Sequence, residues 1–233
     1  MGEKQGSLEA AIAPTVRARI DRGGDRFWGP EDFQDLGNPN AVDQTLADLH
    51  AGGALRRIRR GLYWRGTHTV FGMAAPSASD IIRKITGLNH GIGPSGYSAA
   101  LALGLSTQVP RRETFAVPVR MPTGLPDGIK VVSRAARRGR LDAKLRPQEV
   151  AWLEIAGSWS DHVSDWAEAE DRFLACIDSG EVRPDRLAAA ARTESRSVKE
   201  TIASLLRAAG RQQVAGVNRP NPAARFARVS GVS

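Results

Sequence analysis

The sequence predicts an α+β protein, with a helical N-terminal domain that ends in a basic β-hairpin and a mixed, mainly helical C-terminal domain with a small sheet. Three observations lead to this class. Apolar residues recur at helical spacing along most of the chain, two segments near the middle favour strands, and glycines separate the segments. With 41% hydrophobic and 25% charged residues, the 233-residue chain can bury a core.

Three helices are predicted before residue 54. The first spans residues 8–23, because apolar residues recur every four positions: Leu8, Ile12, Val16 and Ile20. Residues 27–37 are predicted to form a short second helix, with Pro30 at its first helical position. The third helix opens at Asn38 and ends at a glycine pair, and its apolar face consists of Val42, Leu46 and Leu49.

A short, strongly basic hairpin is predicted after the third helix. Residues 54–65 carry apolar anchors on both arms and turn at Arg60-Gly61. The order helix, helix, turn, helix, basic hairpin is that of a winged helix-turn-helix domain, which we assign to residues 1–75. In such a domain the third helix enters the major groove of DNA, and the hairpin lies against flanking phosphates.

Two groups of residues are therefore predicted to contact DNA. The outward face of the third helix should present, near its N-terminal end, Asn40, Ala41, Gln44 and Thr45. The amides of Asn40 and Gln44 match the donor and acceptor of an adenine edge. The hairpin should neutralise phosphates or reach into the minor groove with Arg56, Arg57, Arg59 and Arg60.

Two acids on the third helix oppose this interpretation. Asp43 and Asp48 would repel a nearby phosphate, and Asp48 is expected to turn away from the DNA. Two alternatives stay open at this point. One is a helical domain whose arginines form a solvated face, and the other is a winged helix used for protein contact.

A second domain is predicted at residues 76–210. It contains a helix capped at Ser77, a helix of small residues at 98–104, and strands at 115–119 and 129–132, with four further helices toward the C-terminus. The remaining residues, 211–233, carry four basic and no acidic residues and are predicted to form a flexible basic tail.

Charge is unevenly distributed over this second part of the chain. The basic run 134–146 is either a solvated loop or a surface for an acidic partner or DNA flanks. The acidic stretch 161–171 has aromatic residues within and beside it. It is either a surface for a basic protein or the solvent-exposed side of a helix. The whole chain has a formal net charge of +8.

Catalytic, cofactor and metal chemistry is not expected. Residues 91–96 match G-x-G-x-x-G, but no strand leads into the first glycine, and Ser95 is expected to cap the following helix. Cys176 lies on an apolar helix and should be buried, and the four histidines lack metal-ligand spacing. No apolar run approaches the roughly 18 residues that span a bilayer, and no leader is recognisable, so a cytoplasmic protein without contact to a membrane is expected.

Two segments resemble a known family. Residues 46–63 (LADLHAGGALRRIRRGLY) and residues 97–110 (YSAALALGLSTQVP), followed by a strand, are similar to the AbiEi-type antitoxins of bacterial toxin–antitoxin operons. The segment LGLSTQVP is the more specific of the two, since the Gly61-Leu-Tyr63 hairpin occurs in other winged helices. The resemblance covers about residues 8–210.

The resemblance implies a non-enzymatic protein with two tasks. The winged helix is expected to bind inverted repeats in its own promoter, as a homodimer on DNA, and to repress the operon. The domain at residues 76–210 is expected to neutralise a toxin with a nucleotidyltransferase fold, through direct binding or indirectly. The alternative is a stand-alone transcriptional regulator whose C-terminal domain senses a ligand or dimerises.

Overall fold

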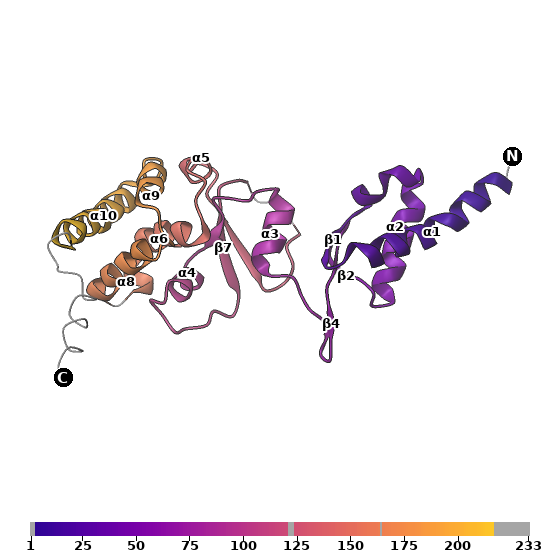
Figure 1. Cartoon of the computed structure of the whole chain (residues 1–233), viewed down its shortest axis with the longest axis horizontal. Coiled ribbons are helices and arrows are strands. Elements are labelled where there is room, and N and C mark those ends of the chain that lie inside the picture. Colours follow the sequence, from indigo (N-terminus) through magenta and orange to yellow (C-terminus); the bar gives the residue numbers. More distant parts are fainter. Residues whose placement is uncertain (1–2, 121–123, 164, 217–233) are drawn as a thin grey trace, which may run out of the picture. The chain divides into compact units, whose positions relative to one another are not determined.

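The computed structural model describes residues 3–120, 124–163 and 165–216 (Figure 1). The fold is α+β and mostly helical, as the sequence predicts. The chain divides into two compact units: unit 1 is Met1–Leu88 with Met121–Lys130, and unit 2 is Asn89–Arg120 with Val131–Ser233. The predicted roles of residues 1–75 and 76–210 remain predictions. No helix in the described part of the chain is long and apolar enough to cross a bilayer.

Unit 1 is built on two helices and a three-stranded sheet. Helix α1 (Glu3–Gly23) and helix α2 (Pro39–Ala51) confirm the first and third predicted helices. Their buried faces meet in one core, which contains Val16, Ile20, Val42, Leu46 and Leu55. Asn38 caps α2, because its side chain accepts a hydrogen bond from the backbone N–H of Ala41 at 3.2 Å.

The predicted helix at residues 27–37 is partly wrong. Its first residues form strand β1 (Arg26–Trp28), and a 3₁₀ helix, η1 (Pro30–Leu36), follows. Strand β1 pairs antiparallel with β3, and the Trp28 ring stacks on Phe33 at 5.7 Å between centroids. Both contacts draw residues 26–28 into the sheet. Gly37 ends η1 in the left-handed conformation, at φ 74°.

The sheet of unit 1 is antiparallel, in the order β1-β3-β2. Strands β2 (Arg56–Arg59) and β3 (Leu62–Arg65) form the predicted hairpin, with Gly61 at the turn in the left-handed conformation, φ 71°. A second, smaller hairpin follows, of β4 (His68–Thr69) and β5 (Gly72–Met73), where the sequence predicted no strands. Helix α3 (Ala78–Thr86) completes the unit and is capped by Ser77, as predicted.

Unit 2 consists of a small sheet and a set of helices. The sheet has the order β6-β7-β8, and the sequence predicted β7 and β8. The helices and strands from residue 93 onward are, in chain order, β6 (Gly93–Pro94), α4 (Tyr97–Ala102), β7 (Glu113–Val117), β8 (Ile129–Ser133), α5 (Gly139–Asp142), α6 (Pro147–Gly157), α7 (Trp159–His162), α8 (Trp166–Asp178), α9 (Pro184–Ala191) and α10 (Arg196–Gly216).

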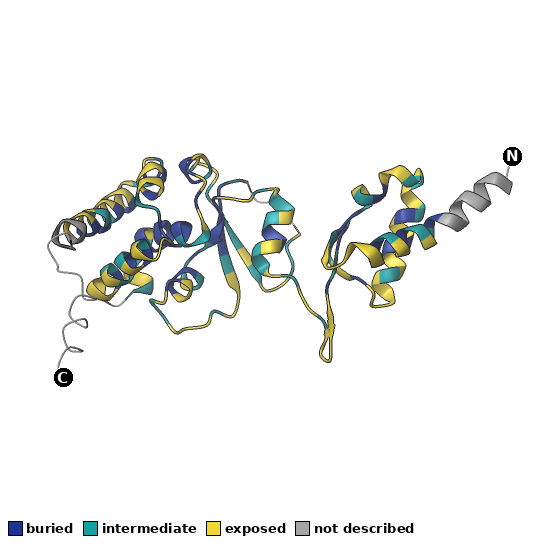
Figure 2. Cartoon of the chain, in the orientation of Figure 1, coloured by how far each residue is buried: buried dark blue, intermediate teal, exposed yellow. Residues whose placement is uncertain are grey.

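Helix α6 is the centre of unit 2. All residues from Glu149 to Ala156 are buried, so the helix has no solvated face, and Trp152 packs edge-to-face on Phe173 of α8 at 5.0 Å between centroids. Figure 2 colours most of the α6 ribbon as buried. Cys176 lies in the same core, as predicted, and burial raises the pKa of its thiol.

The expected surface character of the basic run 134–146 is only partly correct. Arg140 is 1% exposed, and its guanidinium donates to Glu154 and to Glu194 at 2.7 Å each. Arg134 forms a two-pronged contact with Glu154, at 2.9 and 2.8 Å. The excess of arginine in this run therefore includes a buried ionic cluster that ties α5 to α6 and to the residues before α10.

Ser95 does not cap a helix, contrary to expectation. Its hydroxyl donates to Oε2 of Glu154 at 2.6 Å, and Gly96 occupies the cap position of α4. Burial by itself would raise the pKa of Glu154. Hydrogen bonds from Arg134 and Ser95 and the charge of Arg140 outweigh burial and lower this pKa to about 2. The Glu154 carboxylate is therefore charged and joins Ser95, Arg134 and Arg140 inside unit 2.

The tail begins later than predicted. Helix α10 continues to Gly216, so residues 211–216 are helical and do not belong to an irregular segment. The rest of the predicted tail, residues 217–233, lies outside the described residues.

Candidate nucleic-acid interface

The β2–β3 hairpin presents most of its arginines to solvent. Arg57 pairs with Tyr63 and Arg59 with Leu62, so the ladder shifts by one residue at Ile58. This bulge disturbs the alternation of side chains. As a result Arg56, Arg57 and Arg60 are exposed, whereas Arg59 is half-buried.

None of these four arginines forms an ion pair with a carboxylate of the described residues. Several other arginines of unit 1 are paired with acids. Arg19 contacts Asp35 at 2.7 Å, Arg65 contacts Asp21 at 3.4 Å, and Arg26 is paired with Asp32. Arg17 and Arg22 of α1 form no ion pair with the described residues either, but the hairpin brings four such arginines together within five residues.

The four arginines are not equivalent. Arg56 donates to the carbonyl oxygen of Met73 at 3.0 Å and thereby ties the β2–β3 hairpin to the smaller β4–β5 hairpin. The side chains of Arg57 and Arg60 make no hydrogen bond to any described residue. These two guanidiniums are free to bind an external anion without first giving up a partner.

The exposed face of α2 differs from the sequence prediction. Thr45 was expected to face outward, but it is 5% exposed, and its hydroxyl donates to the carbonyl oxygen of Ala41 at 2.7 Å. Ala41 is half-buried and packs against the core. Thr45 is buried because it lies three positions after Val42 and therefore shares the face of α2 that packs against the core.

Of the predicted helix contacts, Asn40 and Gln44 are exposed. The amide of Gln44 donates to Oδ1 of Asp48 at 2.8 Å, one turn along the helix. Asp48 therefore lies beside the group that was to bind a base edge, and Asp43 is exposed as well. The helix face is polar and partly acidic, so the positive charge of the candidate interface comes from the hairpin.

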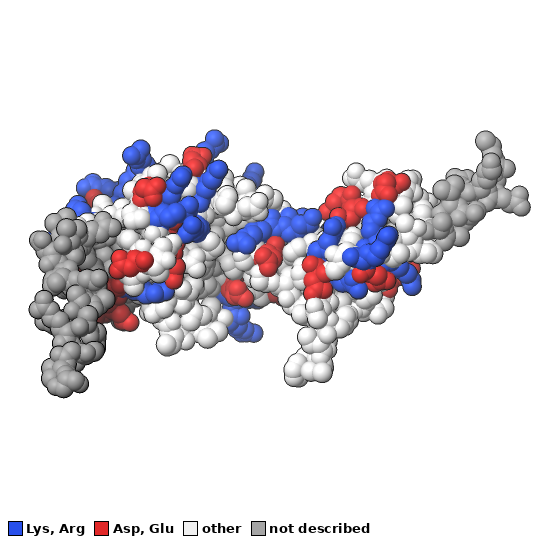
Figure 3. Space-filling model, viewed as in Figure 1, with Lys and Arg blue, Asp and Glu red and all other residues white. Residues whose placement is uncertain are grey.

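The β4–β5 hairpin was not predicted from the sequence. Its turn residues, Val70 and Phe71, are 93% and 97% exposed, and Figure 2 draws the end of the hairpin as exposed, whereas Met73 at its base is half-buried. Figure 3 shows it as a white projection of unit 1 that carries no lysine, arginine or acidic residue on the visible face. The Trp64 indole N–H donates to the carbonyl oxygen of Ala74 at 2.8 Å and anchors the base of the hairpin to β3. Its only sequence signal is the short alternation around Gly72.

Comparison with known proteins supports the fold and the family. No curated protein matches the chain. Among solved structures, the protein Rv2827c from Mycobacterium tuberculosis is similar, with a TM-score of 0.52 and 18% sequence identity, over 91% of this chain and 82% of that chain. At this identity the similarity concerns the fold. The model of a family of unknown function, DUF6088, matches residues 17–139, which include α2, the basic hairpin and the segment 97–110. The chain therefore belongs to the DUF6088 family.

Proposed function

We propose that this protein is a DNA-binding antitoxin without catalytic activity. Unit 1 binds inverted repeats in the promoter of its own operon and represses it, and unit 2 counters a nucleotidyltransferase-like toxin from the same operon. The observation that carries the DNA-binding part is the β2–β3 hairpin, whose four arginines have no carboxylate partner among the described residues.

Physical chemistry explains why unpaired arginines favour a polyanion. A guanidinium that is already paired must release its carboxylate before it can bind a phosphate, whereas an exposed and unpaired one gains the full charge-assisted contact. Binding also releases the cations condensed on DNA, which makes the affinity depend on salt concentration. Asn40 and the free part of the Gln44 amide then supply base contacts from α2.

The antitoxin part rests on the resemblance to AbiEi-type antitoxins. The two segments that carry it, residues 46–63 and 97–110, lie in different units. One includes the basic hairpin and the other includes α4 and the loop after it. A resemblance that involves both units supports a protein with one DNA-binding and one toxin-directed part.

The DNA-binding part is tested with the promoter fragment upstream of the gene. We expect the Arg57→Ala/Arg60→Ala variant to bind more weakly, with the slope of log affinity against log salt reduced by about 2, since each lost phosphate contact reduces it by about 0.9. Adding Arg56→Ala and Arg59→Ala should reduce the slope further. The matched control is Arg111→Ala/Arg192→Ala, two exposed arginines of unit 2. An unchanged slope in the hairpin variants would refute the assignment.

Stoichiometry tests the expected dimer on DNA. Titration of one inverted repeat with the full chain should saturate at two copies per duplex, and at one copy when half of the repeat is scrambled. Saturation at one copy on the intact repeat would contradict binding as a pair.

The antitoxin part is tested by co-expression with the neighbouring gene product. We expect that product to stop growth by itself and growth to be restored by this protein.

A specific observation also favours the stand-alone regulator. Unit 2 contains an open pocket of about 560 Å³ with polar walls, which would accommodate a small effector. A neighbouring product that has no effect on growth would favour the regulator.

A further inference from the structure

The pocket of unit 2 lies between the segment after α4 and the acidic α7–α8 region. We propose that it is the docking site for a protein partner, which inserts an arginine or lysine side chain and covers the apolar residues around the pocket. The inference rests on the proposed antitoxin function, for which it names the toxin-binding surface. We call this surface the acidic hollow; it is lined by residues 104–108, Tyr97, Ser160, Asp161, His162, Val163 and Glu168.

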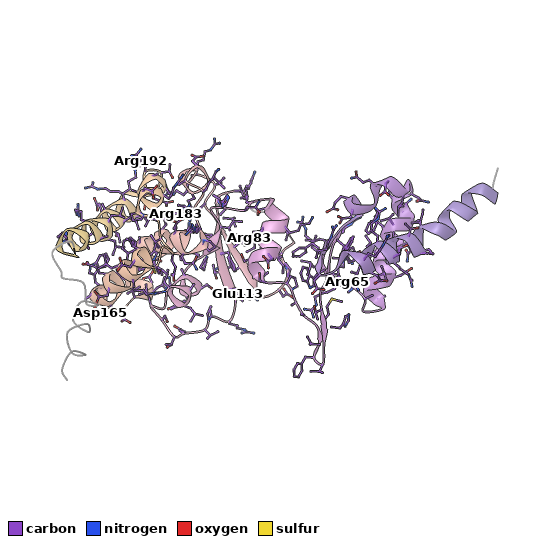
Figure 4. The ribbon with its side chains drawn as sticks, viewed as in Figure 1. Arg65, Arg83, Glu113, Asp165, Arg183 and Arg192 are labelled. Atoms are coloured by element: carbon purple, nitrogen blue, oxygen red, sulfur yellow. The ribbon has the colours of Figure 1, made fainter. Side chains whose placement is uncertain are left out.

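The charge of the acidic hollow selects a basic partner. Asp161 and Glu168 line it, and no lysine or arginine does so among the described residues. Asp165 stands beside them at the start of α8 and is exposed (Figure 4). Arg172, whose side chain lies near Gly104 of the lining, is engaged with the carbonyl oxygen of Leu103 at 2.8 Å and with Glu181 at 3.6 Å. A negative hollow in a chain of net charge +8 is a local exception.

Aromatic rings beside the acidic hollow favour a guanidinium or ammonium as the group that the partner inserts. Tyr97 is 44% exposed, and its ring meets the His162 ring edge-to-face at 4.5 Å between centroids. Trp166 is 36% exposed and is held by Trp159 at 4.4 Å between centroids. Fixed aromatic faces next to carboxylates attract cations through both the ring quadrupole and the formal charge.

The apolar surroundings favour a protein over a small molecule. Six large apolar side chains of the described residues are exposed, and four of them lie on α4, in the loop after it or on α8, which border the hollow: Tyr97, Leu101, Val109 and Trp166. Val109 is 78% exposed, next to Gln108 in the pocket wall. A ligand inside the pocket would leave Val109 in water, whereas a protein surface can cover it. Aromatic anchors with an acidic border are also typical of the centre and rim of protein interfaces.

The test uses the purified product of the neighbouring gene as the probe and measures its affinity for the full chain. We expect Asp161→Asn/Glu168→Gln to weaken binding at least tenfold and to reduce its salt dependence, and Val109→Ser to weaken binding without changing the salt dependence. Two controls match these changes. Asp142→Asn/Asp185→Asn removes two exposed acids remote from the pocket lining, and Val70→Ser/Phe71→Ser removes exposed apolar area from unit 1. Both controls should bind as the wild type does.

The outcomes separate the two proposals. If the neighbouring product is not toxic or growth is not restored, the antitoxin function fails. If growth is restored but no complex forms, or the hollow variants bind as tightly as their controls, the antitoxin function stands and the acidic hollow is not its surface. Loss of binding in Val70→Ser/Phe71→Ser alone would move the surface to unit 1 and overturn the proposal.

A truncated chain tests whether the occupant is the chain itself. Residues 217–233 contain Arg219, Arg225 and Arg228 and no acid, so they match the charge of the hollow. A chain ending at Gly216 should bind the probe as tightly as the full chain does, and with the same sensitivity to Asp161→Asn/Glu168→Gln. If truncation tightens binding and abolishes that sensitivity, the basic C-terminal segment occupies the hollow and the proposal is wrong.

Discussion

Replacement of Glu154 by glutamine probes the ionic cluster at the centre of unit 2. In the wild type, Glu154 is 5% exposed and accepts hydrogen bonds from Arg134, Arg140 and Ser95. The Glu154→Gln variant keeps the shape of the side chain but leaves Arg140, itself 1% exposed, with Glu194 as its remaining carboxylate. Breaking a buried pair from one side costs about 3–5 kcal/mol, so we expect a loss of this size at pH 7.

The pH dependence of the free energy of unfolding gives a second value for the contribution of the Glu154 carboxylate. The pKa of Glu154 falls from 4.5 to about 2 in the folded protein. A carboxyl with a lowered folded pKa stabilises the protein above its unfolded pKa, and this contribution disappears as the pH falls toward the folded value. At about 1.36 kcal/mol for each tenfold change in acidity, it amounts to about 3 kcal/mol. The wild type should therefore lose about that much stability between pH 5 and pH 2 through this residue, and Glu154→Gln should not.

Cys176 provides the assay, because it is the only cysteine and is buried in unit 2. Urea unfolding is followed by the labelling of this thiol with 4,4′-dithiodipyridine, which reacts in acid as well as at neutral pH. The control is Glu200→Gln, whose partner Arg196 is 92% exposed and which should change stability by less than about 0.5 kcal/mol. A stability gap between wild type and Glu154→Gln that is as large at pH 3 as at pH 7 would refute this account of the cluster.

Three further predictions concern single positions. Thr45→Val should leave promoter affinity within about twofold of the wild type, because the hydroxyl is buried and bonded to Ala41; a tenfold loss in a binding titration would return Thr45 to the interface. Gly93→Ala should destabilise unit 2 by about 1–3 kcal/mol in the thiol-labelling assay, since a Cβ would lie 2.5 Å from the Pro147 carbonyl oxygen and 2.6 Å from the Val150 Cβ; wild-type stability would contradict this packing. Ser77→Ala should cost about 1 kcal/mol through the loss of the α3 cap, measured as faster amide exchange in α3, and Ser79→Ala, next to the cap, should have a smaller effect.

Local patterns were sufficient for much of the fold. The four-residue spacing of Ile12, Val16 and Ile20 predicts α1, and the Asn38 cap with the following apolar face predicts α2. Gly61 predicts the tip of the basic hairpin because the turn needs a left-handed residue. These signals depend on residues a few positions apart, so the sequence alone carries them. The same holds for the strands β7 and β8, which are rich in β-branched and apolar residues.

Tertiary contacts decided the rest, because they join residues that no local pattern relates. Strand β1 exists because residues 26–28 pair with β3, across more than 30 positions. Ser95 holds Glu154, 59 residues away, and Arg140 holds Glu194, 54 residues away, so a hydroxyl expected to cap a helix and an arginine expected at the surface became part of a buried cluster. The burial of Thr45 follows from where the core lies against α2, and the acidic hollow exists only where the loop after α4 meets α7 and α8. Sequence determined which segments form helices and strands, and packing determined which charged and polar groups remained free to bind a partner.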